Sequence, residues 1–245
     1  MGDLENARRR LEAARRVAVL TGAGISAPSG IPTFRDPGGL WDNFRIEDFA
    51  TPEGFARDPE RVWRWYLERW QKIREAEPNL AHRKLAELER QKGEGFLLVT
   101  QNIDGLHQRA GSKRVVELHG SIHRMRCTAC RHTAPMPPDE LPPRCPVCGG
   151  LMRPDVVWFG EPLPPGAFEA AAEAFQNANV ALVVGTSAVV EPAASLGRLA
   201  KYGGAYLIEV NPEATPLTPI ADLSLRMGAE EGLDLLIPSD KPEPR

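Results

Sequence analysis

The chain has 245 residues, of which 42% are hydrophobic and 26% charged, with a formal net charge of −3 at pH 7. This length can bury one large core, or a large and a small one. The small negative charge gives no reason to expect nucleic acid or an anionic membrane as a partner. No apolar run approaches the ~18 residues of a membrane span, and residues 1–16 predict a charged amphipathic helix, not a signal peptide. We therefore expect a soluble, cytoplasmic protein.

The first strong pattern is an apolar run, 17–20, which predicts a buried strand and leads into a glycine-rich loop. Gly22, Gly24 and Ala27 give the G-x-G-x-x-A spacing of a dinucleotide turn, where glycines let backbone N–H groups approach a pyrophosphate. Alone this is a weak signal, because such turns often serve only packing. The next predicted strand, 96–100, comes far later than the ~30 residues of a dehydrogenase unit. The loop therefore indicates a dinucleotide but disfavours hydride transfer.

Two helices are predicted next, and Thr51 and Asp58 are their N-caps, each followed by a proline in the first turn. On the second helix, from 59 to about 76, Arg69 falls inside an apolar stripe, one turn after Tyr66. A structural, snorkelling arginine explains this pattern. A hydroxyl and a guanidinium that bind a small carboxylate explain it about equally well.

After a predicted polar helix at 84–92, five more apolar runs each end in a cluster of polar residues. Together with the first run they predict an α/β fold with a Rossmann-like, doubly wound parallel sheet. Ligands bind such sheets at the carboxyl ends of the strands, and six polar clusters in succession favour a ligand-binding rim. The five runs are 96–100, 115–118, 180–184, 205–210 and 223–227.

Two C-x-x-C pairs, fourteen residues apart, lie between the third and fourth strands. This spacing is a strong zinc-ribbon signature. Four thiolates complete a tetrahedral site and leave no position for water, which predicts one structural zinc ion. A pair of disulfides is the alternative, which a cytosolic protein makes unfavourable. The predicted ligands are Cys127, Cys130, Cys145 and Cys148.

An extended apolar segment, 153–161, follows the cysteines. Its pattern is too exposed for a central strand. An edge that pairs with a peptide backbone and a linker between two lobes explain it nearly equally well.

These motifs, in their order, resemble the sirtuins, a family of NAD-dependent protein lysine deacylases with a Rossmann lobe and a small zinc-ribbon plus helical lobe. The resemblance covers nearly the whole chain. It implies that 1–35, 82–120 and 156–240 form the NAD-binding lobe, whereas a helical module, 36–81, and a zinc ribbon, 121–155, form the small lobe. The motifs are GAGISAPSGIPTFR, TQNID, ELHGS, the two C-x-x-C pairs, VVWFGE, GTS and NPE.

The segment WYLER, which holds Tyr66 and Arg69, resembles the Y-x-x-R motif of the branch that removes succinyl, malonyl and related acidic groups. This resemblance favours the carboxylate-binding interpretation of Arg69. Two positions differ from the family pattern. Pro28 stands where a polar residue is usual, and Asp155 stands where related members commonly have histidine.

The resemblance implies that the acyl-lysine carbonyl oxygen attacks C1′ of the nicotinamide ribose, nicotinamide leaves and an alkylimidate forms. His119 would then act as general base on a ribose hydroxyl, since a neutral imidazole can accept that proton near pH 7. The products would be deacylated lysine and 2′-O-acyl-ADP-ribose. Asn102 and Asp104 would orient the ribose and hold the nicotinamide amide. His82 and His107 have no such support, and we expect both to be structural.

The resemblance also implies two sets of binding residues. Tyr66 and Arg69 would receive the acyl carboxylate, and the substrate backbone would pair with a second set: Val156, Val157, Phe159 and Gly160. NAD would bind the glycine loop and the later polar clusters, with Phe34 shielding the reactive carbon. The NAD-binding set is Gly22, Ala23, Gly24, Ile25, Thr33, Phe34, Arg35, Trp41, Gln101, Asn102, Ile103, Asp104, Gly185, Thr186, Ser187, Asn211, Pro212, Glu213 and Ala229.

Two other functions stay open. An ADP-ribosyltransferase using the same NAD site would yield ADP-ribosylated protein in place of free 2′-O-acyl-ADP-ribose. A zinc-ribbon binding module with a vestigial nucleotide pocket would bind NAD or nucleic acid without releasing nicotinamide. For the deacylase, the expected partners are acylated-lysine proteins, with no nucleic acid and no membrane. The sequence specifies neither the oligomeric state nor the individual protein substrates.

Overall fold

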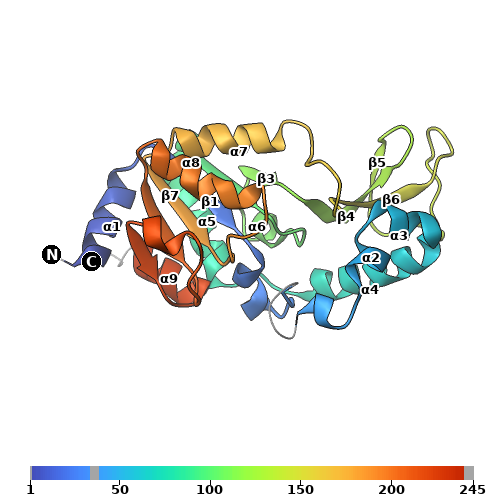
Figure 1. Cartoon of the computed structure of the whole chain (residues 1–245), viewed down its shortest axis with the longest axis horizontal. Coiled ribbons are helices and arrows are strands. Elements are labelled where there is room, and N and C mark those ends of the chain that lie inside the picture. Colours follow the sequence, from blue (N-terminus) through green and yellow to red (C-terminus); the bar gives the residue numbers. More distant parts are fainter. Residues whose placement is uncertain (1, 34–38, 240–245) are drawn as a thin grey trace, which may run out of the picture.

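The centre of the molecule is a six-stranded sheet in which each strand runs parallel to its neighbours. The computed structural model describes residues 2–33 and 39–239, so Phe34 and Arg35 lie outside the described residues. The strand order is β3-β2-β1-β7-β8-β9 (Figure 1). The chain adds β2 and β3 to one side of β1 and β7, β8 and β9 to the other side, so the order in which the chain adds strands reverses at β1. Ligands bind doubly wound sheets at such a reversal. The strands are β1 (Val17–Thr21), β2 (Phe96–Thr100), β3 (Val115–Glu117), β7 (Val180–Val184), β8 (Tyr206–Val210) and β9 (Leu223–Leu225).

All six strands match the predicted apolar runs, so the predicted fold class is confirmed. The runs are apolar throughout because helices cover both faces of the sheet. Alternate residues of one strand serve the two faces: Val19 packs in one hydrophobic cluster, and Leu20 packs in the other. The first face is covered by α1 (Asp3–Ala13), α5 (Leu80–Lys92) and α9 (Ala229–Leu236), and the second by α7 (Ala167–Gln176) and α8 (Leu196–Tyr202).

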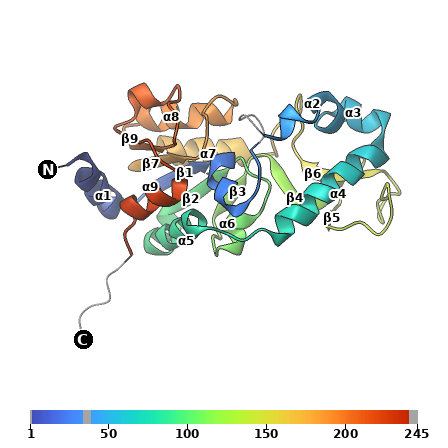
Figure 2. The same ribbon diagram turned by 90° about the horizontal axis from the view of Figure 1, so that it is seen from below.

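A third hydrophobic cluster joins three helices to a small antiparallel sheet of order β5-β4-β6. We call these helices and this sheet the small lobe. Figure 2 shows α2, α3 and α4 at the end of the molecule opposite α1. The elements are α2 (Ile46–Phe49), α3 (Pro52–Arg57), α4 (Pro59–Glu75), β4 (Gly120–Cys127), β5 (Thr133–Pro135) and β6 (Met152–Val156).

The zinc ribbon shares its hydrophobic cluster with the helices of the small lobe. The Trp63 indole N–H donates a hydrogen bond to the carbonyl of Met152 at 3.0 Å, which ties α4 to β6. Cys127 and Cys145 are buried in the same cluster as Trp63. Ribbon and helices therefore stabilise each other.

The predicted helix caps at Thr51 and Asp58 are confirmed. The Thr51 hydroxyl accepts from the amide of Gly54 at 2.9 Å, and the Asp58 carboxylate accepts from the amide of Arg61 at 3.1 Å. Each side chain satisfies an amide that the first helical turn leaves unpaired.

The helix predicted at 84–92 begins earlier, at Leu80. Asn79 is its N-cap, and the His82 side chain accepts the amide of Asn79 in return. Histidine in this capping-box position is not the usual Glu or Gln, which explains why the sequence pattern did not reveal the start. The helix ends at Lys92, as predicted, and the C-cap residue Gly93 has a positive φ of 56°.

The small lobe is built from two insertions into the sheet. The chain leaves after β1 and returns at α5, and it leaves again after β3 and returns at α7. Both departures are at the carboxyl ends of parallel strands. In the described part of the chain, no helix combines the length and the apolar character that crossing a membrane requires.

Candidate active site between the two sheets

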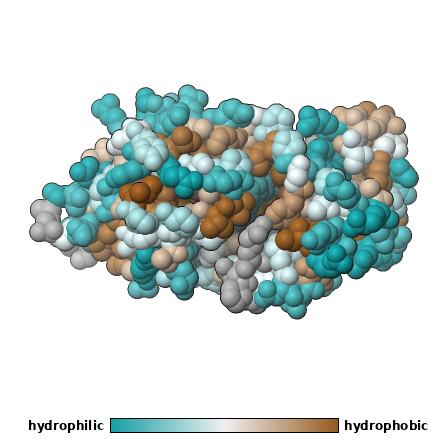
Figure 3. Space-filling view, in the orientation of Figure 1, coloured by the Kyte–Doolittle hydropathy of each residue, from teal (hydrophilic) through white to brown (hydrophobic). Residues whose placement is uncertain are grey.

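A cavity of about 1090 Å³ lies between the carboxyl edge of the large sheet and the small lobe. Small-molecule sites usually have volumes of ~300–1,000 Å³, so this cavity can hold a dinucleotide beside a substrate side chain. Figure 3 shows apolar residues gathered around the hollow in the middle of the molecule. Of the predicted catalytic, cofactor and substrate residues that the structure describes, all except Ile25 and Asp104 line this cavity.

Ile25, which was predicted to bind the cofactor, does not line the cavity. The side chain is fully buried in the hydrophobic cluster beneath the sheet. It lies in a short 3-10 turn, Ala23–Ile25, that directs it to the core and away from the cavity.

Asp104 lies just below the cavity surface and is 4% exposed. Its carboxylate accepts the Ser26 hydroxyl at 2.7 Å and the amide of Leu106 at 2.9 Å. Burial raises the pKa of Asp104, and the hydrogen bonds from Leu106 and Ser26 oppose that rise. Asp104 is therefore positioned to shape the cavity floor.

The two glycines of the first loop permit close packing against a second loop. The amide of Gly24 donates to the carbonyl of Gly185 at 2.8 Å. A Cβ at Gly22 would lie 2.7 Å from the Cβ of Thr186, and one at Gly24 would lie 2.9 Å from the Gly185 carbonyl oxygen. The amide of Gly24 is thus already used, which differs from its predicted role towards a pyrophosphate.

Other amides of the same loops line the cavity and fit that role. Within residues 2–33 and 39–239, the amides of Ala23, Thr186 and Ser187 have no intramolecular acceptor. All three residues line the cavity. Unpaired amides from two converging loops form a cradle for an anion, so these residues fit the phosphates of a dinucleotide.

A buried chain of hydrogen bonds supports Asp104. His82 Nδ1 accepts the amide of Asn79 at 3.0 Å, so its Nε2 carries the proton. That nitrogen lies 3.2 Å from the Ser26 hydroxyl oxygen, and Ser26 donates in turn to Asp104. Burial lowers the pKa of His82 to about 4, which keeps the ring neutral. No charge or periodic pattern in the sequence singled out Ser26.

His107 was expected to have a structural role, and its contacts fit one. It is 1% exposed, and its Nε2 lies 2.8 Å from the Thr21 hydroxyl. Burial lowers its pKa to about 3. The Thr21 hydroxyl also bonds that of Thr100 at 2.8 Å, so these contacts join the carboxyl ends of β1 and β2 below the cavity.

The turn after β2 carries Asn102 into the cavity. Its amide donates to the Thr100 hydroxyl at 3.0 Å, and its side-chain N–H₂ donates to the carbonyl of Gly22 at 2.9 Å. The second bond connects this turn to the glycine-rich loop. Asn102 is 7% exposed, so its remaining hydrogen-bonding capacity faces a site largely shielded from water.

The predicted base, His119, lines the same cavity. Its Nδ1 lies 3.0 Å from the carbonyl oxygen of Gln101. A carbonyl oxygen can only accept, so Nδ1 carries the proton and Nε2 is left as the basic nitrogen. Burial lowers the pKa of His119, partly opposed by the bond to Gln101. The imidazole is therefore neutral near pH 7 and can accept a proton.

The end of β6 and the apolar segment after it line the cavity through Val156, Val157, Phe159 and Gly160. The amide of Val157 donates to the carbonyl of His119 at 2.9 Å, and the amide of Phe159 donates to that of Ala50 at 2.9 Å. Phe159 is 41% exposed, although its apolar ring would favour burial.

An ion pair fixes the end of this segment. The Arg153 guanidinium makes two bonds of 2.7 Å to the Glu161 carboxylate and is centred 3.6 Å from the Trp158 ring. The Glu161 carboxylate also accepts the amide of Trp158 at 2.8 Å. The same indole donates to the Tyr66 hydroxyl at 2.8 Å, so the segment is tied to α4.

Tyr66 and Arg69 both line the cavity. Burial raises the pKa of Tyr66 well above its usual range, so its hydroxyl keeps its proton. In the part of the chain that the structure describes, this O–H has no acceptor, because its one bond is received from Trp158. It can therefore donate to a ligand.

The Arg69 side chain is only 11% exposed. Its guanidinium carbon lies 4.6 Å from the centre of the Phe44 ring and 4.5 Å from that of Trp65. Nη1 donates to the Trp65 carbonyl at 3.3 Å and lies 3.3 Å from the Glu68 carboxylate. Among the described residues, its Nε has no acceptor. Two aromatic rings thus hold a mostly buried cation at the cavity.

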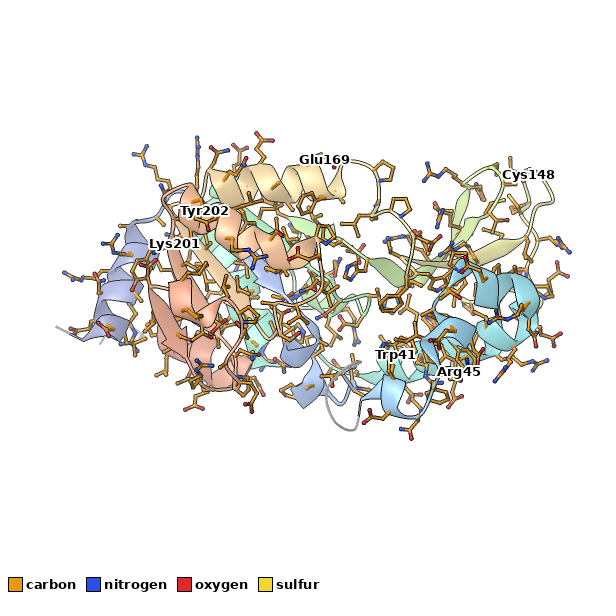
Figure 4. All side chains as sticks on the ribbon, viewed as in Figure 1. Trp41, Arg45, Cys148, Glu169, Lys201 and Tyr202 are labelled. Atoms are coloured by element: carbon orange, nitrogen blue, oxygen red, sulfur yellow. The ribbon has the colours of Figure 1, made fainter. Side chains whose placement is uncertain are left out.

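The sulfur atoms of the four cysteines all lie within 4.8 Å of one another. A tetrahedral zinc site with Zn–S bonds of about 2.3 Å places its sulfurs about 3.8 Å apart. Backbone amides already point at these sulfurs; that of Cys130, for example, lies 3.4 Å from Cys127 Sγ. The donor set therefore fits one structural zinc ion. Figure 4 shows Cys148 at the end of the small lobe, farther from the large sheet than Trp41.

The two unusual residues have local explanations. Asp155 pairs with Arg124 and Arg126 of β4, each at 3.2 Å, so its carboxylate fastens β6 to β4. Pro28 lies in the first turn of a 3-10 helix, Ala27–Ser29, where the missing amide is not needed.

The chain combines a parallel sheet whose strand order reverses at β1, a cavity lined by a neutral histidine, and a four-cysteine site. Together these features define a two-lobed nucleotide-binding protein. Residues 22–192 match the model of the Sir2 family, and the chain belongs to that family, which confirms the sirtuin resemblance.

Similar proteins support this assignment over nearly the full length. A protein of Thermus thermophilus named NAD-dependent protein deacylase is 66% identical over 97% of this chain and 95% of its own. A Sir2 homologue solved with NAD is 50% identical, with a TM-score of 0.88, over 95% of this chain and 92% of its own. A Sir2 variant solved with a deacetylated p53 peptide and 3′-O-acetyl ADP-ribose is 37% identical, with a TM-score of 0.87, over 97% and 98%.

Proposed function

We propose that this protein is a lysine deacylase that removes succinyl and malonyl groups, and also acetyl, from proteins. A close relative is named NAD-dependent protein deacylase. The cofactors of the present protein are NAD and one structural zinc ion. The preference for acidic acyl groups is the finer part of the proposal. A cytoplasmic location, where thiols stay reduced, stays a prediction.

The proposal assigns the segments of the chain to the two predicted lobes. Segments 1–35, 82–120 and 156–240 would form the NAD-binding lobe, and segments 36–81 and 121–155 would form the small lobe. Bound NAD supplies an electrophilic ribose carbon and a nicotinamide leaving group. His119 would accept the proton of a ribose hydroxyl at Nε2, and the amides of Ala23, Thr186 and Ser187 would hold the phosphates.

The buried guanidinium of Arg69 is the observation that carries the acidic preference. A mostly buried cation is costly unless it is paired. Its neighbour Glu68 offers a partial countercharge, but 60% of the Glu68 side chain is exposed to solvent. An acyl carboxylate in the cavity would complete the pairing, and the Tyr66 hydroxyl, one helical turn away, would donate a second bond.

Replacing Arg69 by methionine is expected to cost desuccinylation about 1.5–3 kcal/mol, roughly a 10- to 100-fold loss of kcat/KM. Deacetylation should change much less, because the acetyl group has no carboxylate. Arg64→Met is the matched control, since Arg64 lies on the same helix but pairs with Glu60 at the surface. Steady-state kinetics on succinyl- and acetyl-lysine peptides of one sequence measure the difference. Equal losses on both peptides would remove the acidic pocket from the proposal.

Product analysis tests the reaction itself. The protein is incubated with NAD and matched acetyl-, succinyl- and malonyl-lysine peptides, and the products are resolved by mass. Deacylation predicts free nicotinamide, 2′-O-acyl-ADP-ribose and an unmodified lysine. A peptide or protein that gains ADP-ribose would instead favour the transferase alternative.

The pH dependence follows from the lowered pKa of His119. The base works only when neutral, so activity is lost as pH falls through the pKa of His119. Because burial lowers that pKa, the acid limb of kcat/KM should lie below pH ~6.5, the ordinary value for histidine. A rate profile from pH 5 to 8, with the protein's stability checked at each pH, measures it. An acid limb above pH 7 would contradict the assigned environment of His119.

A further inference from the structure

We propose that His123 is a positioning residue for the turn that carries Asn102 and Asp104, and that it sets how tightly this turn holds nicotinamide. The proposal rests on the NAD-dependent reaction proposed above. His123 lies on β4, four residues beyond His119 and four before Cys127.

Carbonyl oxygens from Thr100 to Asp104 accept from residues of β4 and of the segment just before it. Two of the donors are backbone amides, and two are imidazole rings, one at each end of the 101–104 stretch. The bonds are Leu118 N to Thr100 O at 3.0 Å, His119 Nδ1 to Gln101 O at 3.0 Å, Ile122 N to Ile103 O at 3.0 Å and His123 Nε2 to Asp104 O at 2.7 Å.

The ring of His123 fits closely against the end of the turn. Gly105 has φ +69°, and a Cβ there would lie 2.9 Å from Cδ2 of His123. The main chain of His123 is fixed independently, since its amide donates to the Ser121 hydroxyl at 3.1 Å and its carbonyl accepts the amide of Met136 at 3.0 Å. The imidazole therefore bridges a fixed strand to the turn.

The bond matters because Asp104 is 4% exposed. Its carboxylate already accepts from Ser26 and Leu106, whereas its carbonyl has His123 as its only donor among the described residues. Removing that donor would leave a buried carbonyl unpaired, which costs more than the bond itself contributes. The turn would then shift to reach water, and the side chain of Asn102 would shift with it.

Nicotinamide is released in the first step and can return to the same place. Residues that hold it in position therefore affect both the KM for NAD and inhibition by free nicotinamide. The proposed base, His119, donates to a different carbonyl of the turn, that of Gln101, and this bond does not depend on His123. Loss of the His123 donor should thus act on nicotinamide more than on the later proton transfer.

The test compares His123→Phe, which keeps a ring but loses the donor, with His123→Gln, whose amide can still donate. His123→Phe should raise the KM for NAD and the half-inhibitory nicotinamide concentration by roughly 10-fold, the factor expected for one lost hydrogen bond. Its kcat should stay within about threefold of the parent. His123→Gln should restore both nicotinamide-dependent values. Ser121→Ala, which loosens the same strand but keeps the imidazole, is the matched control for a purely structural effect.

Zinc content and melting temperature are measured for every variant, and calorimetry with NAD and with nicotinamide repeats the test without turnover. Parallel changes in Ser121→Ala and His123→Phe, or a failure of His123→Gln to restore nicotinamide binding, would overturn the positioning role. A parent protein that binds NAD and nicotinamide but forms no deacylated product would instead overturn the proposed function, and the calorimetric comparison would still decide the role of His123.

Discussion

Replacing His119 by alanine is expected to lower turnover by roughly 10²–10⁴-fold, the contribution typical of a general base, while NAD still binds. The neutral ring presents Nε2 to the cavity because Nδ1 is committed to Gln101. Within residues 2–33 and 39–239, the side chain forms no hydrogen bond with the two loops that would hold the phosphates, so cofactor affinity should change little.

Two measurements separate chemistry from binding in this variant. Formation of 2′-O-acyl-ADP-ribose, followed by mass, reports turnover, and calorimetry with NAD reports cofactor binding. His132→Ala removes another imidazole, one that lies in the zinc ribbon away from the cavity, and should leave both values unchanged. A His119→Ala protein with a near-parental rate would refute the assigned base.

Removing the zinc ion is expected to disorder the small lobe and to abolish deacylation, while the large sheet keeps its structure. Structural zinc contributes about 10–16 kcal/mol of binding free energy in zinc-finger peptides, and that energy supports the fold. Two of the four cysteines belong to the hydrophobic cluster that also holds Tyr66 and Trp158. Loss of the ion should therefore disturb the proposed acyl pocket and the apolar segment after β6.

Tryptophan fluorescence reports on this lobe selectively, because all five tryptophans of the chain belong to its hydrophobic cluster. Cys145→Ser, or chelation of the parent, should lower bound zinc from one ion per chain, shift the emission to the red and stop turnover. The helical circular dichroism should fall only in part. Val147→Ser, an exposed change beside the ligands, is the control. A zinc-free protein with unchanged emission and activity would contradict the structural role.

The large sheet could be predicted because its strands are buried on both faces and read as apolar runs. The zinc site could be predicted because ligand spacing along the chain already implies tetrahedral geometry. The strand β4 could not be predicted from the sequence. Its pairing with β6 shifts register between Gly120 and Met125, which breaks the alternation of inward and outward residues that reveals a strand.

The contacts among the buried polar groups also could not be predicted from the sequence. Ser26 contacts His82 and Asp104, which lie 56 and 78 residues away along the chain, so only the folded molecule brings them together. The glycine spacing indicated a loop that does line the cavity, but for a partly different reason. Gly22 and Gly24 leave room for the second loop, whereas the amide groups that face the cavity belong to Ala23, Thr186 and Ser187.

The two insertions that make up the small lobe have a consequence for engineering. Tyr66 and Arg69 lie in the first insertion, whereas His119 and the unpaired amides of the two cavity-lining loops belong to the sheet itself. The part proposed to select the acyl chain is thus encoded separately from the part proposed to carry out the chemistry. Directed evolution confined to residues 59–75 should be able to redirect this protein to new lysine modifications with its bond-breaking machinery left intact.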